Sequence, residues 1–212
     1  MKKIISITVL VFVALSSVLA QDAKSILDKL AAQSKACKTM QGEFEYKLEN
    51  KSSNIYETSK GKYIIKGDKY FIDVMGAETY FDGQYLYSFI KDVDEVSIQN
   101  PESDDEDFLK PSNLFTIYQK GYEHEYVGKI IENGKSIHVI DLLPKKENQN
   151  FKKIIAKIDV KTNNLVSMES IGKSGDDVEI KILTLKKDLP VSDSKFVFDE
   201  TAHPDVEVID MR

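Results

Sequence analysis

The chain has 212 residues, with 29 Lys and Arg against 35 Asp and Glu and a formal net charge of −6. This length suits one domain with a sizeable core, and an acidic, evenly mixed charge disfavours a nucleic-acid partner. Cys37 is the only cysteine. An internal disulfide is therefore excluded, and the fold must rest on its apolar core.

The first 20 residues have the three-part layout of a secretory signal peptide. Two lysines precede an apolar run, and a small residue, Ala20, ends it. The run is too short to favour a membrane span, although an uncleaved anchor is the alternative. We expect cleavage before Gln21, which leaves one domain over residues 21–212. Its formal charge is −8, because 27 basic residues then oppose the 35 acidic ones.

A helix is predicted over residues 22–36, because apolar residues recur from Ile26 at i, i+1, i+4 and i+5. From Met40 the period changes to two, and charged residues alternate with apolar ones, as in a strand with one wet face. We expect the apolar set of this strand to point inward. It consists of Phe44, Tyr46 and Leu48.

Turn signals divide residues 51–98 into a meander of antiparallel strands. The turns are Lys51 to Asn54, Gly67-Asp68 and Asp82-Gly83. The strand predicted at 85–90 is apolar on both faces, with Tyr87 and Phe89 on the same one. This pattern indicates a cover on each side, by core on one and by a helix or ligand on the other. A central strand of a closed sandwich is the alternative.

Residues 100–107 carry five acids and are predicted to be a solvated loop. They lack the ligand spacing, glycine and closing Glu of an EF-hand, so no calcium site is expected. A short second helix is predicted over 108–122, with Pro111 in its first turn. Its apolar stripe consists of Leu114, Phe115, Ile117 and Tyr118.

The rest of the chain is predicted to be strands, with Asn133-Gly134 and Asn163-Asn164 as hairpin turns. The strands are expected at 122–132, 135–143, 151–160, 165–172 and 177–186, with a short final one at 195–199. The total is ten or eleven strands and two helices. So few helices cannot cover both faces of a long sheet, so we expect an open sheet that curls, with the helices in its mouth.

No enzyme signature is present, so neither an enzymatic activity nor a cofactor or metal is predicted. The three histidines lack metal-site spacing, and no nucleophile elbow, P-loop or dinucleotide fingerprint occurs. The Tyr and Phe residues concentrate in the first half, which we interpret as an apolar pocket inside the curl; core packing is the alternative. The candidate lining and lid residues are Phe44, Tyr46, Leu48, Tyr63, Ile65, Tyr70, Ile72, Val74, Tyr87, Phe89, Leu114, Phe115 and Tyr118.

Four stretches carry a family resemblance. They are GKYIIKGDKYFIDV in the meander, the DGQYLYSFIKDVDEV hairpin, LKPSNLF in the second helix and the closing FVFDETAHPDVEVID. Together, and in this order, they resemble the LolA-type outer-membrane lipoprotein carriers over residues 22–210. The resemblance implies a mainly β fold: an unclosed antiparallel β-barrel of about eleven strands, with an α-helical lid around a hydrophobic cavity for acyl chains.

The same resemblance implies a periplasmic chaperone, which we expect to be a monomer. Its cargo would be acylated lipoproteins, taken from an inner-membrane ABC transporter and delivered to an outer-membrane acceptor. The alternatives are a lipocalin-like binder of a small free lipid and an envelope sensor or adaptor on the same scaffold.

One position departs from the family pattern. Related carriers place a basic residue there, which ties the lid shut, whereas this chain has Gly67 and Asp68. Lys66 and Lys69 lie beside this position and could take the role. Otherwise we expect the lid to be closed mainly by the apolar contacts of the second helix.

Overall fold

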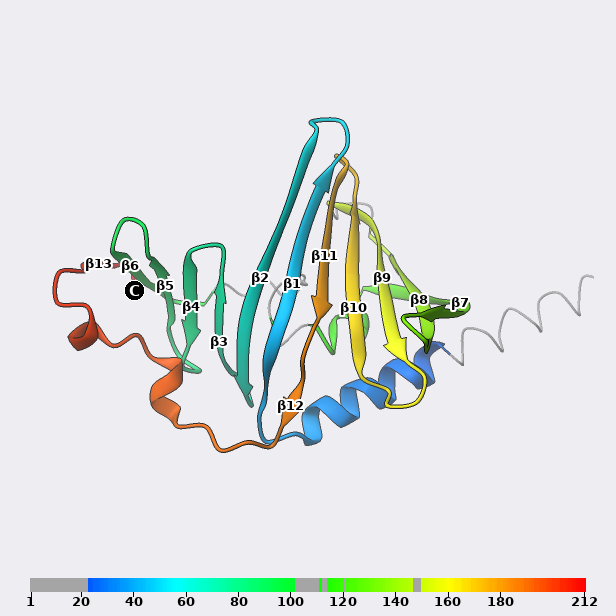
Figure 1. The fold of residues 1–212 in the computed structure, drawn as a ribbon, viewed down its shortest axis with the longest axis horizontal. Coiled ribbons are helices and arrows are strands. Elements are labelled where there is room, and N and C mark those ends of the chain that lie inside the picture. Colours follow the sequence, from blue (N-terminus) through cyan, green and yellow to red (C-terminus); the bar gives the residue numbers. More distant parts are fainter. Residues whose placement is uncertain (1–22, 102–110, 112–113, 120, 147–149) are drawn as a thin grey trace, which may run out of the picture.

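The protein is built on one curved, open sheet of 13 strands, with a single α-helix among the described residues (Figure 1). The computed structural model describes residues 23–101, 111, 114–119, 121–146 and 150–212. The helix spans residues 23–36, as the spacing of apolar residues predicts. The predicted signal peptide, the first residue of the predicted helix and most of the acidic loop lie outside the described residues.

The strands of the first half are β1 (Met40–Asn50), β2 (Ile55–Lys66), β3 (Lys69–Val74), β4 (Ala77–Phe81), β5 (Leu86–Ile90) and β6 (Glu95–Gln99). Those of the second half are β7 (Tyr122–Glu132), β8 (Lys135–Pro144), β9 (Phe151–Asp159), β10 (Leu165–Gly172), β11 (Asp176–Ile182), β12 (Lys186–Lys187) and β13 (Glu207–Asp210). Three 3-10 helices complete the fold: η1 (Ile117–Gln119), η2 (Asp193–Phe196) and η3 (Glu200–Ala202).

The strand order is β13-β6-β5-β4-β3-β2-β1-β11-β10-β9-β8-β7, and β12 pairs with β1 beyond the end of β11. β13 and β7 stand at opposite ends of this order, so the sheet is unclosed, as expected. Neighbours are antiparallel except for β13, which runs parallel to β6. The total of 13 strands exceeds the predicted ten or eleven.

Two of the predicted two-residue turns form. The turn predicted at Asn163-Asn164 is longer, because β9 ends at Asp159 and β10 begins at Leu165, so residues 160–164 connect them. Asn133 and Gly134 have φ angles of 51° and 76° between paired Glu132 and Lys135, as a primed hairpin turn requires. Gly67 has φ 59° between paired Lys66 and Lys69. These turns fix the register of β7 with β8 and of β2 with β3.

The turn at Asp82-Gly83 is longer than predicted. Phe81 pairs with Leu86, so four residues connect β4 to β5, and Tyr85 lies in the turn and not in the strand. The Asp82 carboxylate explains the difference, because its Oδ1 accepts hydrogen bonds from the backbone N–H groups of Gln84 and Tyr85, both at 2.7 Å. This aspartate cap stabilises a wider loop than the two-residue form.

Two predicted elements differ in the structure. In the described part of residues 108–122, only η1 is helical, and Gly121, with φ 80°, separates it from β7. Residues 195–199 do not form a strand: η2 ends at Phe196, and the chain continues through η3 to β13. The alternating phenylalanines of that stretch are both buried, Phe196 at 0% and Phe198 at 5% exposure, but they pack without a strand partner.

The predicted strand over 177–186 is interrupted. β11 ends at Ile182, where the backbone N–H groups of Leu183 and Thr184 both donate to the Glu43 carbonyl, at 2.9 and 3.1 Å. Gly42 permits this close approach, because a Cβ there would lie 1.9 Å from the Thr184 carbonyl oxygen. The result is a bulge that separates β11 from β12.

The two faces of the sheet carry separate apolar cores. The inner face, which carries the helix, has the large core, with helix residues such as Leu27 and strand residues such as Ile140 and Ile154 fully buried. The outer face carries a smaller core around Phe89 and Val96 under residues 191–212, which we call the C-terminal arm. Figure 1 shows this arm, in orange and red, at the end of the sheet formed by β3 to β6.

Candidate functional site

The candidate site is the inner face of β1, β2 and β3, where strand register aligns apolar side chains. Tyr63 pairs with Ile72 in this ladder, and Phe44 pairs with Gly61. A Cβ at Gly61 would lie 2.5 Å from the Phe44 ring, so the ring occupies the space above the glycine. Phe44 and Tyr63 are 6.4 Å apart between ring centroids and both are buried. This face is therefore a continuous aromatic and aliphatic surface.

The helix and the segment 114–119 pack in the same core as this surface. Leu27 and Leu30 of the helix are buried in the same core as Ile117 and Tyr118 of the segment, and Phe115 packs against its edge. The predicted apolar stripe thus lies against the inner face, although its residues form turns and a 3-10 helix instead of an α-helix. The helix and this segment together are called the lid below.

A polar contact joins the two parts of the lid. The Tyr118 hydroxyl donates to Asp28 Oδ1 at 2.9 Å, and His124 Nε2 lies 2.7 Å from the Tyr118 carbonyl. The pKa of Asp28 lies below its ordinary value because the Lys24 ammonium hydrogen-bonds to it and, to a smaller extent, because Tyr118 donates to it. A hydrogen bond at a carboxylate thus adds to the apolar contacts by which Leu27, Leu30 and Ile117 hold the lid in the core.

Lys66 and Lys69 do not act on the lid. Both ammonium groups bind the carboxylate of Asp193, at 2.6 and 2.8 Å, and Lys66 also donates to the Val191 carbonyl at 2.9 Å. These lysines hold η2 of the C-terminal arm instead of the helix. They lower the pKa of Asp193 to about 2 through hydrogen bonds and charge.

A small cavity remains between the lid and the inner face. Its volume is about 10 Å³, close to the space that one water molecule needs. Leu30 and Phe115 of the lid and Met40 and Tyr63 of the sheet are among its lining residues. The lid therefore fills nearly all of the space between itself and the inner face.

Most of the predicted lining residues belong to the inner-face core. They are Phe44, Tyr46, Tyr63, Ile65, Tyr70, Ile72, Val74, Leu114, Phe115 and Tyr118. Leu48 is half-buried beside Val178, outside the inner-face core of the described chain. Its neighbour on β2 is Glu57, whereas its neighbour on β11, Val178, still packs against the core.

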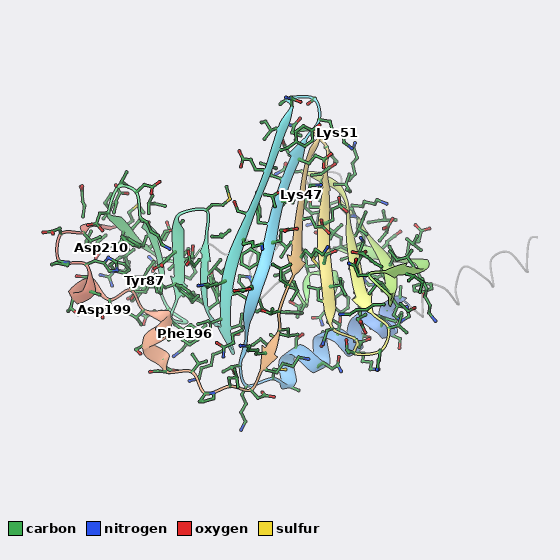
Figure 2. All side chains as sticks on the ribbon, viewed as in Figure 1. Lys47, Lys51, Tyr87, Phe196, Asp199 and Asp210 are labelled. Atoms are coloured by element: carbon green, nitrogen blue, oxygen red, sulfur yellow. The ribbon has the colours of Figure 1, made fainter. Side chains whose placement is uncertain are left out.

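The structure contradicts the predicted placement of Tyr87 and Phe89 in the cavity. The ring centroid of Phe89 lies 5.0 Å from that of Phe198 and 4.6 Å from that of His203. Tyr87 borders the same outer-face core. Figure 2 shows Tyr87 at the end of the sheet that carries the C-terminal arm. The second apolar face of β5 is therefore covered by protein from this arm, whereas Leu86 packs against the inner core.

Sequence reasoning missed the second wall of the site. Residues from β8 to β11 that alternate inward complete the inner-face core; they include Ile140, Leu142, Ile154, Ala156, Ile158, Met168 and Ile180. These strands also alternate with a period of two in the sequence. The prediction of the cavity lining rested on aromatic residues, however, and these are concentrated in the first half of the chain. Asp28 was also missed, because a single charged residue on a helix gives no signal of a distant tyrosine.

The described residues contain no group of three or more His, Cys, Asp or Glu side chains placed to hold a metal ion. His124 and His138 have protein partners, the Tyr118 carbonyl and the Tyr126 hydroxyl. In the part of the chain that the structure covers, no helix has the length and apolar character needed to cross a membrane.

An open curved sheet whose apolar inner face is covered by a helix and a loop defines the class of unclosed half-barrels. Residues 35–199 match the family model described as outer membrane lipoprotein carrier protein LolA. The chain belongs to the LolA family. No curated protein matches it.

Solved structures of similar fold have low sequence identity. A conserved protein from Thermus thermophilus is 9% identical with a TM-score of 0.57, covering 89% of this chain and 99% of that one. A DUF1329 family protein from Desulfovibrio piger is 12% identical with a TM-score of 0.50, covering 87% of this chain and 99% of that one. At these identities the similarity shows the fold alone.

Proposed function

We propose that this protein is a periplasmic carrier that binds the acyl chains of lipoproteins on its inner face and moves them between membranes. The observation that carries the proposal is the large apolar inner surface covered by a lid that is separate in sequence from most of it. The family to which the chain belongs is described as a lipoprotein carrier, which supports the same function. The function is binding and transfer, without a catalytic step.

The energetics of acyl chains explain why a carrier needs such a surface. One acyl chain binds a bilayer with a constant near ~10⁴ M⁻¹, so two or three chains on one protein hold it with about 10 to 15 kcal/mol. Spontaneous release into water is then negligible. A soluble carrier has to provide comparable apolar surface, and the inner face provides it once the lid moves aside.

The other parts of the proposal follow from the same role. The apparent signal sequence would export the chain as one domain over residues 21–212. An inner-membrane ABC transporter would load the carrier, and an outer-membrane acceptor would receive the lipoprotein. The protein would act as a monomer, because one inner face per chain suffices for one cargo.

The test uses two neighbouring residues that face opposite sides of β3. Ile72 lies in the inner core, whereas Phe71 packs on Tyr80 of the outer face, at 4.9 Å between ring centroids. Each is changed to Glu, and extraction of a tripalmitoylated lipopeptide from vesicles into solution is measured. We expect Ile72→Glu to reduce extraction at least tenfold, because a charge on the acyl surface costs more than about 1.4 kcal/mol.

Phe71→Glu is the control for stability. It should lower the melting temperature but leave extraction by the folded protein near the wild-type level. Loss of extraction in both variants to the same degree, or in neither, would show that the inner face does not bind the cargo. Absence of extraction by the wild type would refute the carrier function itself.

A further inference from the structure

The interruption between β11 and β12 opens the wall of the site. β10 and β11 pair only from Ser167 with Lys181 to Ser170 with Val178. Beyond Lys181 the chain remains paired with β1, first through Ile182 and then through β12, and Figure 1 shows this segment diverging from β10. We call the opening between residues 164–166 and 182–187 the slit.

Cavities lie on both sides of the slit and share part of its lining. The small inner cavity and an outer groove of about 830 Å³ are both lined by Asn164, Leu165, Ile182 and Leu185. Three of these four residues are apolar, and Leu165 is buried. The slit is therefore a candidate apolar passage, since its lining residues border both the lid-covered interior and the surface.

A positive charge stands at the rim of this passage. The Lys187 ammonium donates to Asn164 Oδ1 at 2.8 Å across the slit, and its side chain is half-buried. Its partner is neutral, and no carboxylate of the described residues forms an ion pair with it. A cation beside an apolar passage suits a ligand that has an anionic head and an apolar tail.

The outer groove adds to this positive potential. Lys135, Lys161 and Lys181 line it, whereas Lys187 lines the inner cavity. The groove has two acids: Glu132 pairs with Lys157 at 3.0 Å and with Lys181 at 3.8 Å, and Asp159 accepts hydrogen bonds from the loop that follows it. An anionic head group would thus meet lysines whose charge these acids do not fully offset.

We propose that the slit binds one single-chain lipid with an anionic head group. The tail lies between Leu165, Ile182 and Leu185 and enters the interior beside Phe115, while the head group binds Lys187 in place of Asn164. This inference rests on the proposed function in one respect, that the inner face accommodates acyl chains. The slit adds a second entrance to the interior. It also adds a preference for a negatively charged head group, which binding of a lipoprotein acyl chain does not require.

The test compares a dansyl-labelled undecanoic acid with its methyl ester, which differ in the charge of the head. Wild type should bind the acid more tightly than the ester. Lys187→Gln removes the cation but keeps a donor for Asn164, and it should lower affinity for the acid by about two- to fivefold, the range for a partly exposed ion pair. Affinity for the ester should not change.

Lys186→Gln is the matched control, because Lys186 is exposed and outside both cavities. It should leave both affinities at the wild-type level. Competition with palmitate and with lysophosphatidylglycerol distinguishes a free fatty acid from a lipid as the natural source. Equal affinities of wild type for acid and ester, or equal losses in the two lysine variants, would overturn the proposal.

A variant that fills the slit, Leu185→Trp, tests the route independently of charge. It should weaken binding of acid and ester alike without reducing extraction of the lipopeptide, which enters past the lid. If acid binding depends on Lys187 but wild type extracts no lipopeptide, the carrier function fails and the slit stands. If wild type extracts the lipopeptide but acid binding does not depend on Lys187, the carrier function stands and the slit proposal fails.

Discussion

Gly42 is the residue on which the bulge between β11 and β12 depends. Its backbone meets Thr184 so closely that an added Cβ would lie 1.9 Å from the Thr184 carbonyl oxygen. A second contact joins the two segments: the backbone N–H of Glu43 donates a hydrogen bond to Thr184 Oγ1 at 2.9 Å. No rotation of a side chain can relieve a clash with backbone.

We therefore expect Gly42→Ala to destabilise the protein by about 1 to 3 kcal/mol or more, as overpacking does. The measurement is the midpoint of urea unfolding. Gln41→Ala, at the neighbouring position of the same strand, is the control and should cost less than about 1 kcal/mol. Equal losses in the two variants would mean that the close approach is absent in solution.

Asp193 gives the C-terminal arm a predictable response to acid. Its pKa is lowered from 3.8 to about 2 by the two lysine ammonium groups. Because the folded form has the lower pKa, the stabilisation is present above about pH 4 and is lost as the pH falls through about 2. Acid removes the contacts of Asp193 but not the apolar contacts of Phe196 and Phe198, which do not titrate. We therefore expect the arm to loosen before the sheet unfolds.

Amide NMR spectra recorded from pH 5 to pH 2 test this prediction. Signals of η2 should shift or broaden with an apparent pKa near 2 in wild type, and Asp193→Asn should show the loosened spectrum at every pH. An Asp193→Asn spectrum that matches wild type at pH 5 would mean that the lysine contacts do not hold the arm.

At the scale of elements, the lid is tied by the hydrogen bond between Tyr118 and Asp28. Tyr118→Phe removes the hydroxyl and keeps the ring, which is only 3% exposed. We expect a loss of about 0.5 to 1.5 kcal/mol in stability and a higher affinity for a dansyl-labelled acyl probe, because the closed state is the one that loses the bond.

Tyr56→Phe is the control, since Tyr56 is 58% exposed on β2, away from the lid. It should change neither stability nor probe affinity. If Tyr118→Phe lowers stability and leaves probe affinity at the wild-type value, the helix and residues 114–119 are ordinary core elements and not a lid.

Elements with local signals could be predicted from the sequence. β7 and β10 have the predicted bounds, because turn residues stand at their ends. The register shifts inside both strands were not predicted. The break after β11 could not be predicted, since it is caused by Gly42, more than 100 positions earlier in the sequence. Residues 195–199 alternate like a strand, yet their phenylalanines pack on the sheet without hydrogen-bonding to its edge.

The candidate site could be predicted only in part, because it too depends on contacts between residues that are distant in the sequence. Alternation shows which residues of a strand share a face, but it does not show which face is inside. β5 is apolar on both faces, so Tyr87 and Phe89 were assigned to the wrong side of the sheet. The deciding partner, Phe198, lies in an arm whose position depends on tertiary contacts.

At the scale of the whole molecule, the two faces of the sheet have different roles. Its inner face combines a wide apolar surface with a lid held by few polar contacts, as a binding surface that opens requires. At the end formed by β3 to β6, its outer face is covered by the C-terminal arm, in which Phe196 is fully buried. Figure 2 labels Phe196, Asp199 and Asp210 of this arm. The central claim is that cargo acyl chains enter only the inner face.

Photo-crosslinking tests this claim most directly. A tripalmitoylated lipopeptide with a diazirine on one acyl chain is loaded onto the wild-type protein, illuminated and mapped by mass spectrometry. Crosslinks should fall on inner-face and lid residues, represented by Tyr70, Ile72 and Phe115. Crosslinks concentrated on the outer-face residues Phe89 and Phe198 would contradict the account.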